Sequence, residues 1–375
     1  MTEHSSSGSE PKQHHFVPQF YLRAFSENKK QINLYNFKRR KVISGAPIKK
    51  QCARAHFHAF APGLEQALGG IEGDAAAAIR TILDRKSAPR PGSEEWKAIL
   101  AFIAFQKART ERSEQVINAT GDFLVKTSLQ RGPSFSNFDF DKIEIKNKYA
   151  IALAFELVEL TLQYASDLGM HLLLNESETD FLTSDDPVAA HNQYCEGITY
   201  RGVLGWNCRG LQLFLPLSPR FVLLLYDKAV YKVDGSRHGE CSSVIRYPEH
   251  VRLINDLQAL NAHQNVYFMG TPNQDTMTYL REVTQRRTEG RTTFVETEPV
   301  KLPSGQMSQM LHTFEPILPL SLTLPQITIR RRARRIDLDA RGGQYRHAPK
   351  ERFYAHPNVS VPTHTRHAVR KITRK

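Results

Sequence analysis

Long apolar segments are missing from this sequence of 375 residues. A membrane-spanning helix needs about 20 apolar residues in succession, whereas the longest clean apolar run here is Phe221–Tyr226. Residues 1–11 are polar and rich in serine, so they have no apolar centre of the kind found in a secretory signal peptide. These absences predict a cytoplasmic protein without a membrane partner.

Cysteine is scarce, and the common site motifs are missing. The four cysteines form no C-x-x-C pair, which argues against a zinc knuckle, a redox motif or a disulfide scaffold. The chain also has no G-x-G-x-x-G, Walker, nucleophile-elbow or H-E-x-x-H pattern. Nucleotide folds, serine hydrolases and zincins therefore have no sequence support, and we expect no nucleotide cofactor.

Acidic residues are scarce in one part of the chain, its C-terminal end. Residues 330–375 contain 14 Lys and Arg and 3 Asp and Glu, which is +11 of the total net charge of +13. Few large apolar residues remain there, so we predict a basic, flexible tail that could attract nucleic acid. Residues 1–329 carry a net charge of only +2, and this near-neutral body gives no such argument.

Helical periodicity dominates the first half, and strand-like runs dominate the second. We expect a helix from Leu64, one long helix from the N-cap Ser93 to about Gln130, and another over about 140–167. Residues 170–174 with 181–183, and 211–217 with 221–226, indicate two hairpins. The order predicts an α+β fold, with a helical first half packed with a mixed or antiparallel β-rich second half.

The same patterns divide the chain into four parts. Residues 1–11 are expected to be a disordered lead, and residues 12–300 a single globular α+β domain. Residues 301–329 form a C-terminal extension, and the basic flexible tail of residues 330–375 follows it.

The sequence HHFVPQFYLRAF at 14–25 is long and unusual, and five further segments follow it in order to about residue 270. They are Glu65 and Glu72, FIAFQKART at 102–110, FLTSDDPV at 181–188, FLPLSP at 214–219, and the segment from Leu253 to Asn261. In this order they resemble an uncharacterised, largely bacterial family, the domain of unknown function 4238, and the first of them resembles its opening signature. The resemblance implies no particular chemistry, because the activity of the family is not established.

The histidine pair His14 and His15 is the sharpest candidate feature. A His pair before an apolar residue and a proline is similar to the histidine of His-Asn-His nucleases, where an imidazole activates water beside a cation. The further Asn and His of a ββα unit are not seen, because the sequence predicts a helix directly after the His pair. The next histidines along the chain are His56 and His58. The alternative is structural: one histidine caps or hydrogen-bonds the start of that helix.

Two carboxylates are spaced by seven residues. Glu65 and Glu72 lie two helical turns apart, so both can point to one side and hold a hard cation such as Mg²⁺ or Mn²⁺. The alternative is a solvated acidic face near a helix start.

Two further polar groups stand among apolar residues. Gln106 and Arg109 need partners in a largely buried helix, and Arg109 could hold a carboxylate of Glu65, Glu72 or Asp185, or a substrate phosphate. Asp185 and Asp186 end a strand, where they could present carboxylates to a metal or form an Asx-turn. Asn255, together with Gln106 and Asp186, is expected in a polar network.

Two functions remain open from the sequence. The first is a divalent-metal-dependent phosphodiester hydrolase, with His14 or His15 as base or ligand, Glu65, Glu72 and Asp185 as oxygen ligands, and Arg109 on phosphate. The second is a non-enzymatic binding or effector module with a nucleic-acid-attracting tail. An enzyme requires these groups to meet in one cleft, whereas a module does not.

Overall fold

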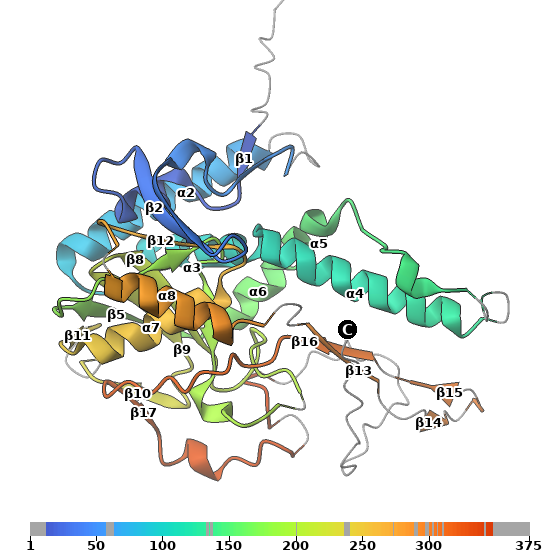
Figure 1. The fold of residues 1–375 in the computed structure, drawn as a ribbon. Coiled ribbons are helices and arrows are strands. Elements are labelled where there is room, and N and C mark those ends of the chain that lie inside the picture. The colour runs from blue at the N-terminus through green and yellow to red at the C-terminus, as the bar shows by residue number, and fades with distance from the viewer. Residues whose placement is uncertain are drawn as a thin grey trace, which may run out of the picture.

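Two sheets lie at the centre of the computed structural model (Figure 1). It describes residues 13–57, 64–132, 135, 138–199, 201–235, 241–272, 274–288, 292–296, 300–301, 304–305, 307–309, 311–340 and 343–347. The expected α+β fold is confirmed, because helices pack against mixed and antiparallel sheets.

The larger sheet has the strand order β11-β5-β9-β8-β7. Only β11 and β5 run parallel; the other neighbours are antiparallel. Alternate residues of β8 enter separate apolar clusters, Leu213 and Leu215 in one and Phe214 in the other, so both faces of the sheet are covered. The strands are β5 (Gly169–Asn175), β7 (Ala189–His191), β8 (Gln212–Ser218), β9 (Phe221–Tyr226) and β11 (Ser242–Ile245).

The second sheet joins the two halves of the chain. Its order is β3-β2-β12-β6, all antiparallel, so the N-terminal hairpin β2–β3 pairs with strands from the second half. Register fixes Tyr35 opposite Val266. The strands are β2 (Gln31–Asn36), β3 (Lys41–Pro47), β6 (Thr183–Ser184) and β12 (Asn265–Phe268).

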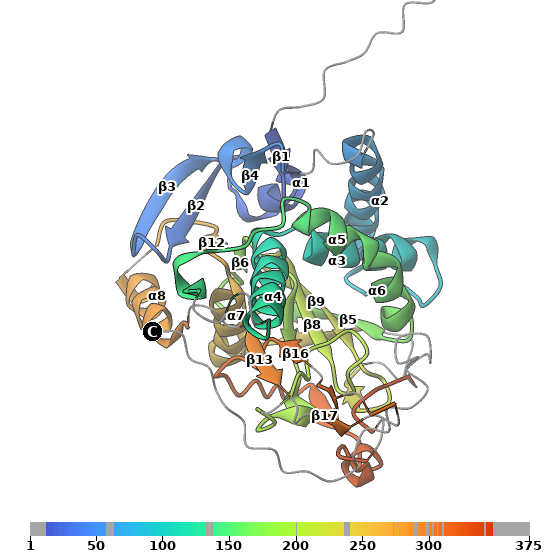
Figure 2. The same cartoon turned by 90° about the vertical axis from the view of Figure 1, so that its right-hand side faces the viewer.

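Helices cover both faces of the larger sheet. Figure 2 shows α2, α3 and α6 on one side of β5, β8 and β9, and α7 and α8 on the other. The helices are α1 (Gln19–Leu22), α2 (Leu64–Arg85), α3 (Glu94–Ala108), α4 (Glu111–Gln130), α5 (Ala150–Glu156), α6 (Val158–Ala165), α7 (Pro248–Asn261) and α8 (Gln274–Arg286). Short 3₁₀ turns occur at η1 (Arg23–Phe25), η2 (Ile48–Lys50), η4 (Phe140–Lys142), η5 (Gln193–Cys195) and η6 (Ala333–Arg335).

Four pairs of short strands complete the described structure. They are β1 (Gln13–His15) with β4 (Ala53–Ala55), β10 (Tyr231–Val233) with β17 (Ile327–Ile329), β13 (Thr293–Glu296) with β16 (Leu311–Phe314), and β14 (Val300–Lys301) with β15 (Met307–Ser308). The β1–β4 pair places the histidine motif, because it fixes which face each histidine takes.

The predicted long helix from Ser93 is wrong in its length. Ser93 does cap α3, accepting a hydrogen bond from the amide of Trp96 at 3.2 Å. The helix then ends at Ala108 with Arg109 as its C-cap, and Thr110 caps a separate helix, α4, by accepting from the amide of Ser113 at 3.1 Å. The predicted helix over 140–167 is likewise divided into η4, α5 and α6.

One of the two predicted C-terminal hairpins is wrong, and one is confirmed. Strands β8 and β9 pair as expected. The strand at 170–174 instead pairs with β9 and β11, whereas Thr183 pairs with Tyr267 of β12.

The start of the predicted tail is packed on the body. Arg330 donates from Nε to the carbonyls of Lys228 and Tyr231 at 3.0 and 2.9 Å, and Ala333 is fully buried. Arg346 donates to the carbonyls of Cys208 and Trp206 at 3.0 and 2.7 Å. A flexible tail beginning at Arg330 is therefore wrong for 330–340 and 343–347, and the rest of the predicted tail lies outside the described residues.

Candidate functional site

The pairing of β1 with β4 turns the two histidines to opposite sides. His14 lies opposite Arg54 and is 1% exposed, whereas His15 is half-buried. Nδ1 of His14 lies 3.5 Å from Oε1 of Glu65 on α2, an ion pair when the imidazole is protonated. Nε2 of His15 instead lies 3.2 Å from the carbonyl oxygen of Lys49. Only His14 therefore joins the predicted carboxylates.

Arg109 joins the second carboxylate from the end of α3. As the C-cap of that helix it leaves helical geometry, and its side chain turns inward, leaving the residue 1% exposed. It donates from Nη1 to Oε1 of Glu72 at 2.7 Å, and from Nε and Nη2 to Oε1 of Gln106 at 3.1 and 3.0 Å. Gln106 in turn donates to the carbonyl of Phe16 at 2.8 Å, which ties α3 to the histidine motif.

These contacts place two carboxylates at the surface with a basic side chain behind each. The side chains of Glu65 and Glu72 are 27% and 29% exposed, whereas His14 and Arg109 are buried. Burial lowers the pKa of the Arg109 guanidinium, and the charges of Glu72 and Glu65 oppose that shift. An arginine stays protonated in proteins, so a permanent positive charge lies beneath this acidic pair. We call His14, Glu65, Glu72 and Arg109 the paired-carboxylate site.

Asp185 does not belong to this site. It is 2% exposed, and its carboxylate accepts hydrogen bonds from the amides of His263, Gln264 and Asn265 at 2.7, 2.7 and 2.8 Å. Burial raises the pKa of Asp185 to about 7, although the three amides favour the ionised form. The carboxylate therefore fixes the connection from α7 to β12, and the prediction that it shares a cation with Glu65 and Glu72 is not supported by this geometry.

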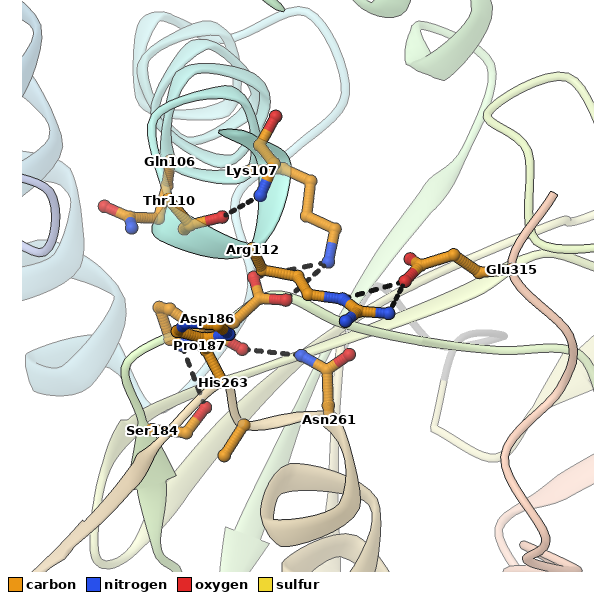
Figure 3. Close-up of polar contacts among 12 residues, drawn as sticks. Gln106, Lys107, Thr110, Arg112, Ser184, Asp186, Pro187, Asn261, His263 and Glu315 are labelled. Carbon is orange, nitrogen blue, oxygen red and sulfur yellow. Dashed lines mark hydrogen bonds and ion pairs between the residues drawn. The ribbon is translucent and has the colours of Figure 1, made fainter. Parts of the chain in front are cut away.

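Asp186 forms a second ion pair beside α3 (Figure 3). Nζ of Lys107 lies 2.9 Å from its Oδ2, and Asn261 donates to its backbone carbonyl at 2.7 Å. Next to it, Nε of Arg112 donates to Oε1 of Glu315 at 2.8 Å. The sequence analysis missed Lys107, Arg112 and Glu315. Lys107 and Arg112 lie on either side of the α3–α4 break, whereas Glu315 follows β16 and has no signal in the sequence.

Asn255 has a third, separate set of partners. Its side-chain amide donates to the carbonyl of Asp180 at 2.9 Å, and its Oδ1 accepts from the amide of Leu182 at 2.9 Å. Gln106, Asp186 and Asn255 thus lie in three sets of contacts rather than in the single network predicted. His56 lies with its ring centroid 6.5 Å from that of His14, and His58 lies outside the described residues.

The paired-carboxylate site offers oxygen ligands but not a complete metal cage. Among the side chains that the structure describes, no three His, Cys, Asp or Glu residues come together to hold a metal ion. Magnesium usually takes one or two protein carboxylates and completes its shell with water and substrate phosphates. Two partly exposed glutamates fit that mode of binding, and they do not fit a closed structural metal site.

Comparison with known proteins finds a family but no characterised relative. The family model described as "Protein of unknown function (DUF4238)" matches residues 13–270, which include all four residues of the paired-carboxylate site. No curated protein and no solved structure matches the chain. In the described part of the chain, no helix is long and apolar enough to span a membrane.

Proposed function

Since the chain belongs to the family DUF4238, whose description assigns no reaction, we propose from its site that it is a divalent-cation-dependent phosphodiester hydrolase. The observation that carries the proposal is the exposure of Glu65 and Glu72 above buried His14 and Arg109. Partly exposed carboxylates held by fixed partners are ligands that Mg²⁺ and Mn²⁺ use in phosphoryl chemistry.

Arg109 orients Glu72 in this proposal. Its contact uses Oε1 of Glu72, and from the described residues no other hydrogen bond or ion pair reaches that carboxylate. The second oxygen can then serve a cation while the guanidinium fixes the rotamer. A bound Mg²⁺ or Mn²⁺ would neutralise phosphate charge and make a coordinated water more acidic.

His14 acts through Glu65 rather than on the substrate. At 1% exposure its ring cannot meet a bound phosphodiester, but Nδ1 faces Oε1 of Glu65 and can hold a proton there. His14 is therefore a positioning residue in this proposal, and Glu65 is the group that takes a proton from water or binds the cation. This differs from the expectation that a histidine itself contacts the substrate.

The test is hydrolysis of bis(p-nitrophenyl) phosphate with Mn²⁺ or Mg²⁺ by the full chain. We expect Glu65→Gln and Glu72→Gln each to lower kcat/KM by about a hundredfold or more, because each removes a charged group used in the reaction. Asp74→Asn is the matched control, since Asp74 is an exposed carboxylate on the same helix. Equal activity in all three variants, or hydrolysis that persists in EDTA, would contradict the proposal.

A binding or effector module is the second candidate, and one observation favours it. Arg109, Gln106 and the carbonyl of Phe16 satisfy one another within the chain, as in a structural polar network. In that case Glu72→Gln lowers the free energy of unfolding, and the native protein hydrolyses no phosphodiester. Thermal denaturation of the same variants therefore separates the two candidates.

A further inference from the structure

Positive charge is concentrated in a short N-terminal segment as well as at the C-terminus. Residues 19–50 contain nine Lys and Arg but only one acidic residue, Glu27, which gives this segment a net charge of +8. Residues 1–329 as a whole carry only +2, so the rest of the body is net acidic. The net charge of residues 1–329 therefore does not reveal the local positive charge of residues 19–50, which is of the kind that attracts polyanions.

Four of these cations line one pocket. The pocket has a volume of about 370 Å³ and lies between α1, η2 and the open end of the β2–β3 hairpin. We call it the basic pocket. Its lining residues are Gln19, Arg23, Lys29, Lys30, Gln31, Pro47, Ile48 and Lys49. None of these is acidic or aromatic.

Backbone and side-chain contacts hold the walls of the basic pocket. The amide of Ile48 donates to the carbonyl of Lys30 at 2.9 Å, which joins the two sides. Nη2 of Arg23 donates to Oε1 of Gln19 at 3.2 Å. Lys29 adopts a left-handed conformation with φ of 58°, and this turn carries its side chain to the same hollow. The cations are thus gathered by the fold and not merely by sequence proximity.

The cations of the basic pocket are not neutralised by the described part of the chain. Arg23, Lys29, Lys30 and Lys49 are exposed, and within that part none forms an ion pair with a carboxylate. Unpaired cations around one hollow repel one another, and a bound anion relieves that repulsion. The pocket therefore has the charge of an anion site.

We propose that the basic pocket binds the phosphodiester backbone of a nucleic acid strand. Phosphate recognition needs Lys, Arg and amide donors, which the lining provides. A nucleotide base instead stacks on aromatic side chains, and the lining of this pocket contains none. The identification of the strand as substrate rests on the proposed hydrolase. The backbone carbonyl of Lys49 lies 3.2 Å from Nε2 of His15, so the basic pocket adjoins β1, the strand that also carries His14.

The experiment measures binding of the full chain to a fluorescein-labelled oligothymidylate in EDTA by anisotropy, at low and moderate salt. We expect the triple variant Lys29→Gln, Lys30→Gln, Lys49→Gln to bind at least about tenfold more weakly, with a log–log salt slope reduced by about 2, at ~0.7 per phosphate contact on a single strand. The matched control is Lys38→Gln, Arg39→Gln, Lys41→Gln. It removes the same charge from exposed residues at the opposite end of the same hairpin. We expect its affinity to remain within about twofold of the native value.

Three outcomes would overturn the inference. Equal weakening in both triple variants would mean that only bulk charge matters, and native affinity in the pocket variant would place binding elsewhere. If the pocket variant loses affinity for inorganic pyrophosphate but not for the oligonucleotide, the ligand is a free phosphate compound. Binding in EDTA does not depend on hydrolysis, so failure here is distinguishable from failure of the Glu65 and Glu72 test.

Discussion

Buried charge at Arg109 and Asp185 has two different physical solutions. Arg109 is satisfied by the carboxylate of Glu72 on α2 and by the amide oxygen of Gln106 on its own helix, α3. Its charge remains useful to the partly exposed Glu72. Asp185 is satisfied by three backbone amides from one connection, so its charge serves only the fold. A side-chain partner thus distinguishes Arg109 in the candidate site from Asp185 in the scaffold, whose partners are backbone amides. The type of partner cannot be predicted from the residue alone.

Asp185 makes stability depend on pH. Its folded pKa of about 7 lies above the usual value near 4, so the folded state binds a proton more tightly than the unfolded state. The contribution of Asp185 to stability is complete below about pH 4 and is lost as the pH rises through 7. We expect the difference in free energy of unfolding between native protein and Asp185→Asn to fall by roughly 2–4 kcal/mol over this interval.

Urea denaturation of both proteins across this pH range measures the difference. The asparagine variant is the matched control because it keeps the shape of the side chain but does not titrate. A difference that grows with pH would show that the three amides, rather than burial, set the protonation of Asp185.

At the scale of elements, the break between α3 and α4 at Thr110 was not predicted from the sequence. Periodicity continues from α3 into α4, and neither proline nor glycine interrupts it before Gly121. The helix nevertheless breaks, because Arg109 gains Glu72 and Gln106 by leaving helical geometry and Thr110 supplies the next cap. Glu72 lies on α2, far from Arg109 in sequence, so a distant partner overrides local helix propensity here. A single sequence does not contain that information.

We expect Thr110→Ala to lower the free energy of unfolding by about 1–2 kcal/mol, because the amide of Ser113 loses its buried acceptor. Thr110→Ser keeps the hydroxyl and should remain within about 0.5 kcal/mol of native. Chemical denaturation provides both values. No loss in the alanine variant would show that this cap does not set the break between α3 and α4.

The pairing of strands shows the same difference: pairs that are close in sequence could be predicted, and pairs that are distant could not. Strands β8 and β9 follow one another across a short turn, so the sequence predicts their pairing. Strand β5 pairs with β9 and β11, and β6 pairs with β12, partners that lie far along the chain. The meeting of His14 with Glu65 and of Arg109 with Glu72 could be expected from the need of buried polar groups for partners. The separation of Asp185 from them could not.

The family match and the body of the protein do not end at the same residue. The matched region stops at residue 270, yet Glu315 pairs with Arg112 inside that region. Residues 330–340 and 343–347 also lie beyond the matched region, and they pack on β10 and on the loop before β8. Composition assigned this segment to the tail because it is basic and has few large apolar residues to bury. The side chain of Arg346 is nevertheless only 2% exposed, with donors on backbone carbonyls and on Asp167.

Two truncations test where the folded chain ends. A chain ending at Ile329 loses Ala333 and Arg346, and it leaves the carbonyls of Trp206 and Cys208 without their donor. We expect its free energy of unfolding to fall by about 3 kcal/mol or more, whereas a chain ending at His347 should remain within about 1 kcal/mol of the full chain.

The variant Arg346→Ala in the full chain isolates the contribution of the guanidinium, and we expect it to show most of the loss of stability seen in the chain ending at Ile329. Equal stability of both truncated chains would contradict the packing of residues 330–340 and 343–347. The proposal that residues 330–375 attract nucleic acid is then best tested with the chain ending at His347, because that truncation removes seven Lys and Arg and keeps every residue that the structure describes.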